Sequence, residues 1–323
     1  MRPKSLLAVS FAFATALLLG NPARAADEFP SRPVEIIICF APGGNLDLAV
    51  RVMGDELSKR LGVPVILTNK GGAGGVAGTE YVAGARPDGY TVLAAPIGVF
   101  SILPFLTPGL HYKLSDFIPL CKYASAPSVI LVRKNSPFKD FQALISHAKK
   151  NPGKLVCASA GTGTATHFSL EMIKIQAGVD IAHLPYKSGG EVNTSVLGGQ
   201  VDLATQAFSP AVGLLKSGDL RALVSTSGKI PDFPDIPTIG ELGYPKATLG
   251  IWSGYFLPKG TPKPIVEKLA SVFEKAMKNP AVVKNLENSG QMLDYLDGPT
   301  FTRFIIEENK TLEEVARKAK IIK

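Results

Sequence analysis

The chain is poor in cysteine, in clustered charge and in long apolar runs, and each shortage excludes a class of protein. Three cysteines in 323 residues are too few for a disulfide framework. Cys39, Cys121 and Cys157 each lie in or beside an apolar run, which favours buried free thiols, although a bridge between Cys39 and Cys157 stays open. Basic and acidic residues are interspersed, which gives no support for nucleic-acid binding. No stretch after residue 19 is long and apolar enough for a transmembrane helix.

Signatures of the common enzyme classes are missing as well. The sequence has no G-x-S-x-G nucleophile motif, and its four histidines include no H-E-x-x-H and no pair at metal-ligand spacing. Residues 72–77 fit the loose G-x-G-x-x-(G/A) dinucleotide pattern, but no acidic residue ends a strand about 20 residues further on. We therefore predict a protein that is not an enzyme and holds no cofactor and no metal. An exported dinucleotide-dependent oxidoreductase is the remote alternative.

The first 25 residues have the pattern of a secretory signal peptide. Arg2 and Lys4 precede an apolar stretch at 6–19, which is shorter than the roughly 20 residues of a membrane span and is followed by a small-x-small sequence at 23–25. We predict that residues 1–25 are cleaved and that the mature protein is periplasmic. The leader contains three basic residues and no acid, so its removal changes the formal net charge from +8 to +5. That balance favours small anionic ligands.

The most informative feature is a strand–turn–helix pattern that occurs twice. A β-branched run at 34–40 ends in Pro42-Gly43-Gly44, which is followed by Asn45 as a predicted helix cap and then by a helical stretch. A second copy occupies 155–167. Such a turn leaves the first backbone N–H groups of the helix unpaired at its positive end, where anions bind. Two such turns predict two lobes that close on one anionic ligand.

Short β-branched runs alternate with helical stretches along the chain, which predicts an α/β fold. We expect two lobes, each a mostly parallel sheet flanked by helices, with a lobe at 127–248 inserted into a discontinuous lobe at 26–126 and 249–323. The hinge should lie near 124–128 and 247–251, where the chain crosses between the lobes. Predicted strands lie at 34–40, 63–68, 91–94, 128–132, 154–158, 202–205, 222–225 and 254–257. Predicted helices lie at 46–61, 75–83, 140–150, 166–177, 191–197, 211–217, 262–278, 280–288 and 299–320, the last capped by Thr300.

Nine short motifs occur in a characteristic order, at 40–47, 69–75, 87–91, 158–167, 183–187, 198–203, 220–223, 235–238 and 258–262. With these motifs the chain resembles the substrate-binding proteins of the tripartite tricarboxylate transporter family, also called Bug receptors, over its whole mature length. The resemblance implies a two-lobed Venus-flytrap periplasmic receptor with crossover strands at the hinge. It implies capture of a small carboxylate and delivery to a large and a small integral membrane subunit. Receptors of this kind are usually monomers. A receptor that signals to a sensor protein would have the same site and is the alternative.

The resemblance also implies a ligand site between the lobes, built from backbone amides and hydroxyls instead of an arginine clamp. Glycines let the backbone approach an anion closely, and threonine hydroxyls donate hydrogen bonds. The first loop would supply Pro42, Gly43, Gly44, Asn45 and Asp47, and the second Ser159, Ala160, Gly161, Thr162, Gly163, Thr164 and Thr166. Asn69, Ala95, Pro96, His167 and Gln206 complete the predicted site.

Several of these residues also suit a structural role. Asp47 either caps its helix or contacts the ligand through water. His167 suits a structural bond from its ring to a backbone carbonyl better than a ligand contact. Arg51 suits an ion pair, and Tyr186 and Trp252 suit the core better than the wall of the cleft.

Two departures from the family pattern bear on the ligand. Gln206 stands where many relatives carry an aspartate, which favours a simple carboxylate over an amino acid. Residues 95–97, Ala-Pro-Ile, replace hydroxyl residues of relatives, which predicts a more apolar pocket. Together they favour a dicarboxylate with an apolar middle, aliphatic or aromatic, over a hydroxyl-rich acid such as citrate. A urea-like or nicotinate-like ligand stays open.

Overall fold

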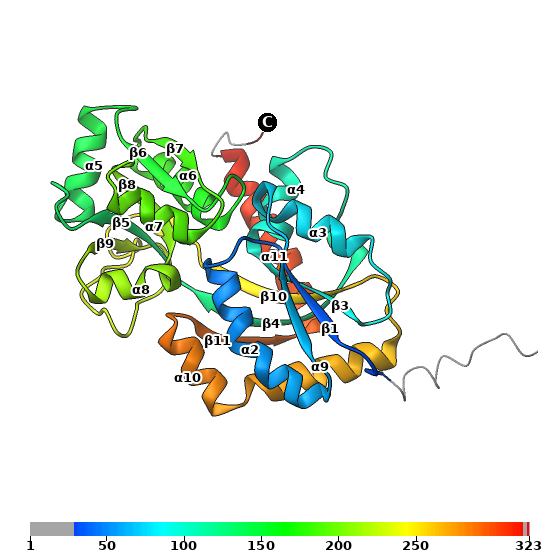
Figure 1. The fold of residues 1–323 in the computed structure, drawn as a ribbon. Helices are drawn as coiled ribbons and strands as arrows, with labels where there is room; N and C mark the ends of the chain where they lie inside the picture. Colours follow the sequence, from blue (N-terminus) through cyan, green and yellow to red (C-terminus); the bar gives the residue numbers. More distant parts are fainter. Residues whose placement is uncertain (1–28, 319–321, 323) are drawn as a thin grey trace, which may run out of the picture.

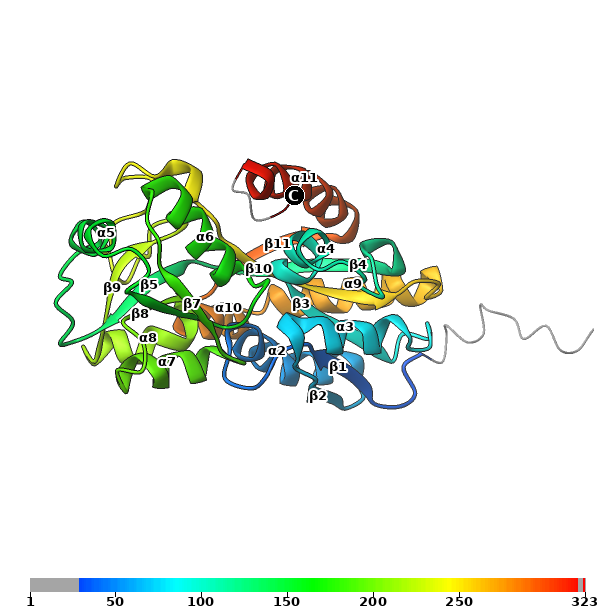
Figure 2. The same cartoon turned by 90° about the horizontal axis from the view of Figure 1, so that it is seen from above.

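Two β-sheets, each flanked by helices, lie side by side in the computed structural model, which describes residues 29–318 and 322 (Figure 1). Figure 2 shows the same two bodies from above, with the green to yellow-green elements forming one and the blue, cyan, orange and red elements forming the other. The predicted leader, 1–25, lies outside the described residues. Among the helices that are described, none is both long and apolar enough to cross a membrane.

The larger sheet has six strands in the order β11-β4-β10-β3-β1-β2. Pairing is parallel between β1 and both β2 and β3, and antiparallel where β10 meets β3 and β4 and where β11 meets β4. Strands β1 to β4 therefore run in one direction, against β10 and β11. The strands are β1 (Val34–Ile38), β2 (Val65–Asn69), β3 (Thr91–Pro96), β4 (Phe117–Ala126), β10 (Ile251–Pro258) and β11 (Met292–Asp297). Helices of this part are α2 (Asn45–Leu61), α3 (Val76–Ala83), α4 (Leu103–Leu106), α9 (Lys263–Met277), α10 (Pro280–Asn288) and α11 (Gly298–Lys318).

The smaller sheet has five strands in the order β7-β6-β8-β5-β9. β6 pairs parallel with β7 and β8, whereas β5 pairs antiparallel with β8 and β9, so β5 runs against the other four. The larger sheet thus has two parallel and three antiparallel strand pairs, and the smaller sheet has two of each. The expected α/β fold of two helix-flanked sheets is confirmed, with mixed sheets instead of mostly parallel ones. The strands are β5 (Ser128–Arg133), β6 (Val156–Ser159), β7 (Ala182–Pro185), β8 (Leu203–Ala207) and β9 (Leu220–Ser225), and the helices are α5 (Phe141–Lys150), α6 (Ala165–Ala177), α7 (Gly189–Leu197) and α8 (Phe208–Lys216). Short helical turns at Ala73–Gly75, Gly98–Ile102, Leu114–Asp116 and Pro245–Ala247 complete the fold.

The pattern of apolar residues explains how α2 is held against the larger sheet. Leu46, Val50, Met53 and Leu57 recur at helical spacing and are at most 4% exposed. β1 contributes three consecutive isoleucines with no exposed surface, because helices cover both faces of that strand. Packing on β1 fixes where the turn between β1 and α2 lies, and that turn is the first predicted ligand loop.

The structure corrects three details of the predicted elements. The helix cap before α2 is Gly44, without a side-chain bond, and Asn45 is the first helical residue. The last helix begins at Gly298, and its cap is the carboxylate of Asp297, which accepts from the backbone N–H of Thr300 at 2.7 Å. The prediction also omitted β4, β7 and β11. β4 contains a proline and the buried Lys122, and β7 and β11 are short and largely exposed, so none of them shows a clear β pattern.

The three cysteines are free and buried, which confirms the prediction of unpaired thiols. Burial raises the pKa of Cys39 and Cys157 to about 12, so both remain protonated at neutral pH.

Within the described residues the chain passes between the two sheets twice. The first passage is Pro127, between β4 and β5, and the second is the segment 226–250 between β9 and β10. Thr226, which is fully buried, ties the two passages together. Its N–H donates to Ser128 O at 2.7 Å, and its carbonyl accepts from the N–H of Leu249 at 2.7 Å.

Candidate functional site

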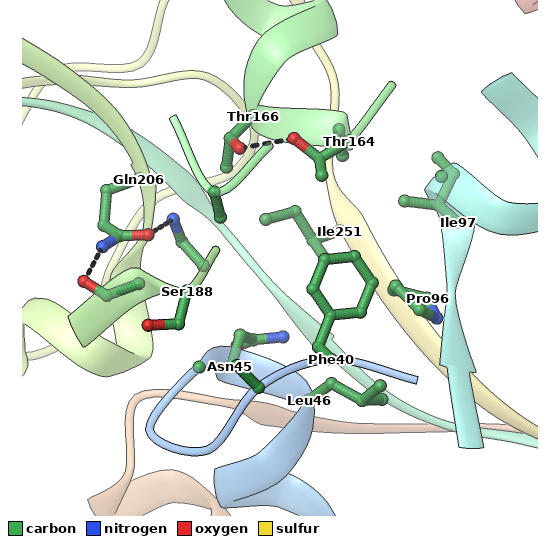
Figure 3. A pocket seen from close by; sticks show the side chains of 17 residues that line it. Phe40, Asn45, Leu46, Pro96, Ile97, Thr164, Thr166, Ser188, Gln206 and Ile251 are labelled. Atoms are coloured by element: carbon green, nitrogen blue, oxygen red, sulfur yellow. Dashed lines mark hydrogen bonds between the residues drawn. The ribbon is translucent and has the colours of Figure 1, made fainter. Parts of the chain in front are cut away.

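A cavity lies between the two bodies, at the ends of β1, β3, β6 and β8 (Figure 3). The carboxyl ends of strands in open α/β sheets are where such folds bind ligands. The atom-free space is about 580 Å³, part of which opens to solvent. The larger body contributes Phe40, Ala41, Gly44, Asn45, Leu46, Pro96, Ile97, Gly98 and Ile251, and the smaller body contributes Ala160, Thr164, Ala165, Thr166, Ser188, Gly189, Gln206 and Ala207.

Four helices begin at this cavity. The capping residues of α2, α6, α7 and α8 are Gly44, Thr164, Ser188 and Ala207, and all four line it. The first N–H groups of a helix have no partner within the helix, and the helix dipole adds positive potential there. Among the described residues that line the cavity none is charged. Positive potential at this site thus comes from backbone groups, which suits a small anion.

The cavity wall has a polar side and an apolar side. Figure 3 shows the side chains of Gln206, Ser188 and Asn45 on one side, facing Phe40 and Ile251 on the other. Leu46, Pro96 and Ile97 extend the apolar side, while the hydroxyls of Thr164 and Thr166 lie 2.9 Å apart above the cavity. An anion with an apolar carbon skeleton fits a wall of this kind.

Asp47 organises the first loop. Its carboxylate accepts from the N–H of Gly43 at 2.9 Å, from Asn69 Nδ2 at 2.9 Å and from the guanidinium of Arg51 at 3.0 Å. Burial pushes the pKa of Asp47 upward, but hydrogen bonds from Arg51, Gly43 and Asn69 outweigh it, so that pKa is lowered overall. Asp47 therefore stays ionised and fixes the turn at Gly43. The predicted ion pair of Arg51 is confirmed.

Two stacked histidines support the second loop from behind. The rings of His167 and His183 lie 4.2 Å apart, and Ser159 Oγ lies 2.6 Å from His183 Nε2. The ring of His167 accepts at Nδ1 from the N–H of Gly163 at 3.2 Å, so its partner is a backbone donor and not the carbonyl expected from the sequence. Burial lowers the pKa of both rings to about 4. His167 is thus neutral at pH 7, as its acceptor role requires.

Gln206 makes hydrogen bonds with both ends of its amide. Nε2 donates to Gly189 O at 2.7 Å, and Oε1 accepts from the N–H of Ala207 at 3.0 Å. The side chain is 1% exposed and holds the start of α7 next to the start of α8. It lines the cavity as an uncharged group.

The structure sorts the predicted site residues into three groups. Gly44, Asn45, Pro96, Ala160, Thr164, Thr166 and Gln206 line the cavity. Pro42, Asn69, Gly161 and Thr162, again with Ala160, line an adjoining groove that also includes Tyr186. Gly43, Asp47, Ala95, Ser159, Gly163 and His167 line neither. Trp252 is in the core, against Phe301, with its Nε1 donating to Glu308 at 2.7 Å.

The site predicted from the sequence did not include the N-terminus of α7. Ser188 and Gly189 reach the cavity although they follow β7, a strand that the pattern did not reveal. A local signal exists, because Ser188 and Glu191 have capping-box spacing. The N–H of Glu191 donates to Ser188 Oγ at 3.3 Å, and the N–H of Lys187 donates to the Glu191 carboxylate at 3.0 Å.

Residues 49–323 match the family model described as Tripartite tricarboxylate transporter family receptor. The chain belongs to this family. The protein BugT of Bordetella pertussis is 33% identical to this receptor over 90% of each chain. MatC of Rhodopseudomonas palustris, solved with bound malate, is 31% identical with a TM-score of 0.84, over 89% of this receptor and 99% of MatC. Rpa4515 of the same organism, solved with adipate, is 28% identical with a TM-score of 0.87, over 91% and 99% of the two chains.

Family membership identifies the chain as a periplasmic solute-binding protein of the Bug type and not an enzyme. The oxidoreductase alternative is therefore wrong. Residues 72–77, which suggested it, form a short helical turn and the start of α3, where a Cβ at Gly75 would come within 2.9 Å of Val99 Cγ2. The next residue, Gly78, is packed as closely. A Cβ at Gly78 would come within 2.8 Å of Cys39 Cα, so the helix packs directly on the backbone after β1.

Proposed function

We propose that this receptor binds a small dicarboxylate with an apolar middle in the cavity between its lobes. One observation carries the proposal. Four helix N-termini and no charged side chain meet at a cavity with an apolar side wall. Helix termini from both lobes supply donors for two carboxylates, and Phe40, Ile97 and Ile251 give a methylene or aromatic skeleton an apolar surface.

The solved relatives support the ligand class. Malate and adipate, held by MatC and Rpa4515, are both dicarboxylates, of four and six carbons. The apolar wall at Pro96 and Ile97 favours an adipate-like skeleton over one that carries a hydroxyl, because a hydroxyl buried there would lose its bonds to water.

We propose that the cavity-lining members of the predicted site contact the ligand and that the others act through the loops. Gly43 and Asp47 shape the first loop, and Ser159, Gly163 and His167 shape the second. Ala95 belongs to the interior of β3 and sets the position of Pro96. Pro42, Asn69, Gly161 and Thr162 border the groove through which a ligand would enter.

The capture step in this proposal is a hinge closure. A lobe of residues 127–248 would rotate against a lobe of 26–126 and 249–323 about the two passages joined at Thr226. Ligand binding to the first lobe would favour the closed state, because the second lobe adds donors only when closed. The mature protein, after loss of residues 1–25, would act as a periplasmic monomer and deliver its ligand to the large and small membrane subunits of a tripartite tricarboxylate transporter.

A thermal-shift panel on the ligand-stripped mature protein tests the ligand class. The panel comprises succinate, malate, adipate, citrate, nicotinate, glutamate and a nicotinamide dinucleotide. A ligand at 100 times its Kd adds about 2.7 kcal/mol of stability, and we expect the largest rise with adipate. A rise with glutamate or citrate alone would refute the proposed ligand class.

The Gln206→Asp variant tests how the receptor discriminates against amino acids. Glutarate and glutamate differ by one amino group, so the ratio of their Kd values isolates recognition of that group. The new carboxylate should weaken glutarate binding and improve glutamate relative to it, and Gln206→Glu controls for side-chain length. An unchanged ratio in both variants, measured by calorimetry, would show that position 206 does not select the ligand.

A further inference from the structure

A hydrogen bond between the lobes lies beside the cavity but outside its lining. Ser209, on the first turn of α8, is 6% exposed. Its Oγ lies 2.8 Å from Asn45 Oδ1, on the first turn of α2 in the other lobe, and 3.2 Å from the carbonyl oxygen of Gly290. The single hydroxyl proton of Ser209 therefore has two acceptors, and both belong to the opposite lobe.

The opposite lobe holds these acceptors in place. Gln291 Nε2 donates to the carbonyl of Asn45 at 3.1 Å, and Gln291 is 1% exposed. Gly290 has a φ of +74°, and a Cβ there would come within 2.6 Å of Val212 Cγ2 and 2.8 Å of Phe208 Cδ1. The α8 helix thus packs directly on the Gly290 backbone, which only glycine permits. The contact is a tightly fitted junction between the lobes.

We propose that Ser209 and Gly290 form an interlobe latch that stabilises the closed state and sets the affinity of the receptor without selecting its ligand. The latch rests on the proposed hinge closure, since its donor stands on one lobe and both of its acceptors stand on the other. Asn45 connects it to the ligand, because the same residue lines the cavity and accepts the bond from Ser209. Ser209 is a positioning residue, which acts on the ligand through Asn45.

Only molecules whose lobes can close bind the ligand fully, so the population of that state sets the measured affinity. Apparent affinity falls in proportion to the fraction of molecules that are closed or able to close. Loss of one neutral hydrogen bond should shift that equilibrium roughly 2- to 12-fold. Every ligand that requires closure should then lose affinity by the same factor, mainly through faster dissociation.

The test measures lobe separation in the ligand-free full-length mature protein. Cysteines introduced at the exposed Lys59 in α2 and Lys149 in α5 carry a pair of distance labels, and the native cysteines are at most 1% exposed and should not compete. We expect Ser209→Ala to increase the population at long distance and to weaken succinate, glutarate and adipate binding by a common factor. Ser217→Ala is the matched control, because that hydroxyl bonds only within its own lobe, to Leu214 and Asp219.

A second pair of variants probes the Gly290 side of the latch, in case Ser209→Ala has only a small effect on lobe separation. Gly290→Ala and Gly218→Ala place the same methyl at the same φ of +74°, but a Cβ at Gly218 meets nothing within 4 Å. Both should lose similar stability, and only Gly290→Ala should shift the lobes apart and weaken the acids, by more than tenfold.

Three results would contradict the latch. No change of distance in Ser209→Ala and Gly290→Ala, with ligand-induced closure intact in the unmodified protein, would refute the latch alone. Weaker binding of one acid but not another, at unchanged distance, would make Ser209 a ligand contact instead. An unmodified protein whose distance does not respond to any acid in the panel would refute the proposed closure and the latch with it.

Discussion

The substitution Gly98→Ala should separate closure of the lobes from stability of the fold. Gly98 follows Ile97 at the cavity, and it needs no positive φ. A Cβ there would come within 2.8 Å of the carbonyl oxygen of Gly163 and 3.3 Å of Thr164 Cα, both in the opposite lobe. Since backbone atoms cannot rotate away, the added methyl must push the lobes apart. In an open state the same methyl would be free of these contacts.

The expected loss of adipate affinity in Gly98→Ala follows from the cost of overpacking the contact between the lobes. An extra methyl forced into a packed contact costs about 1–3 kcal/mol, which corresponds to a loss of affinity of roughly 5- to 150-fold. The cost falls on the closed state, so the ligand-free protein should unfold close to the unmodified one. At an adipate concentration of 100 times the unmodified Kd, a tenfold weaker variant should gain about 1.4 kcal/mol instead of about 2.7 kcal/mol.

The assay is thermal unfolding with and without adipate, supported by calorimetric titration. Gly84→Ala is the matched control, because Gly84 also has a negative φ, of −88°, and its Cβ would lie at least 3.8 Å from its neighbours. Full adipate stabilisation in Gly98→Ala would refute a ligand-bound state in which Gly98 lies against Gly163. An equal loss in both variants would show that the effect is not specific to the interface.

Two further predictions concern the supports behind the loops. Asp47→Asn should lower the free energy of unfolding in urea at pH 7 by about 1–2 kcal/mol, a figure that allows for the half-exposed Arg51. The control is Asp55→Asn, at an exposed position on the same helix, which should lower it little. Because folding lowers the pKa of Asp47, its contribution to stability is fully present above the usual pKa of 3.8 and is lost as pH falls through the pKa in the folded state. An equal loss of unfolding free energy in Asp47→Asn at pH 7 and at pH 2.5 would contradict this. Burial lowers the pKa of His167 and His183 from 6.5 to about 4, so the folded state binds fewer protons than the unfolded state between those values. The free energy of unfolding should therefore fall as pH drops from 6.5 to 4, and His167→Gln should make this pH dependence shallower. An unchanged pH dependence would show that the His167 ring does not contribute to it.

The predicted strands and helices that proved accurate were those with a strong local pattern. The isoleucines of β1, the glycine turn at 42–44 and the apolar stripe of α2 depend on neighbours within a few residues, so the sequence reveals them. The order of such elements also indicated two α/β lobes. β4 escaped notice because its ten residues include Pro119 and Lys122, which a local pattern counts against a buried strand.

Tertiary structure decided which residues face the cavity. Gly43 and Gly44 are neighbours in the same loop, but only Gly44 lines the cavity, because Asp47 draws the N–H of Gly43 toward itself. Ser188 reaches the same cavity from the segment after β7, a strand that shows no clear local pattern, because β7 pairs with β6. The sequence by itself determined the fold class, the family and the two glycine turns that precede helices, since each depends on local spacing. Which donors converge depends on strand order and lobe contact, which link residues far apart in the chain and leave no local pattern.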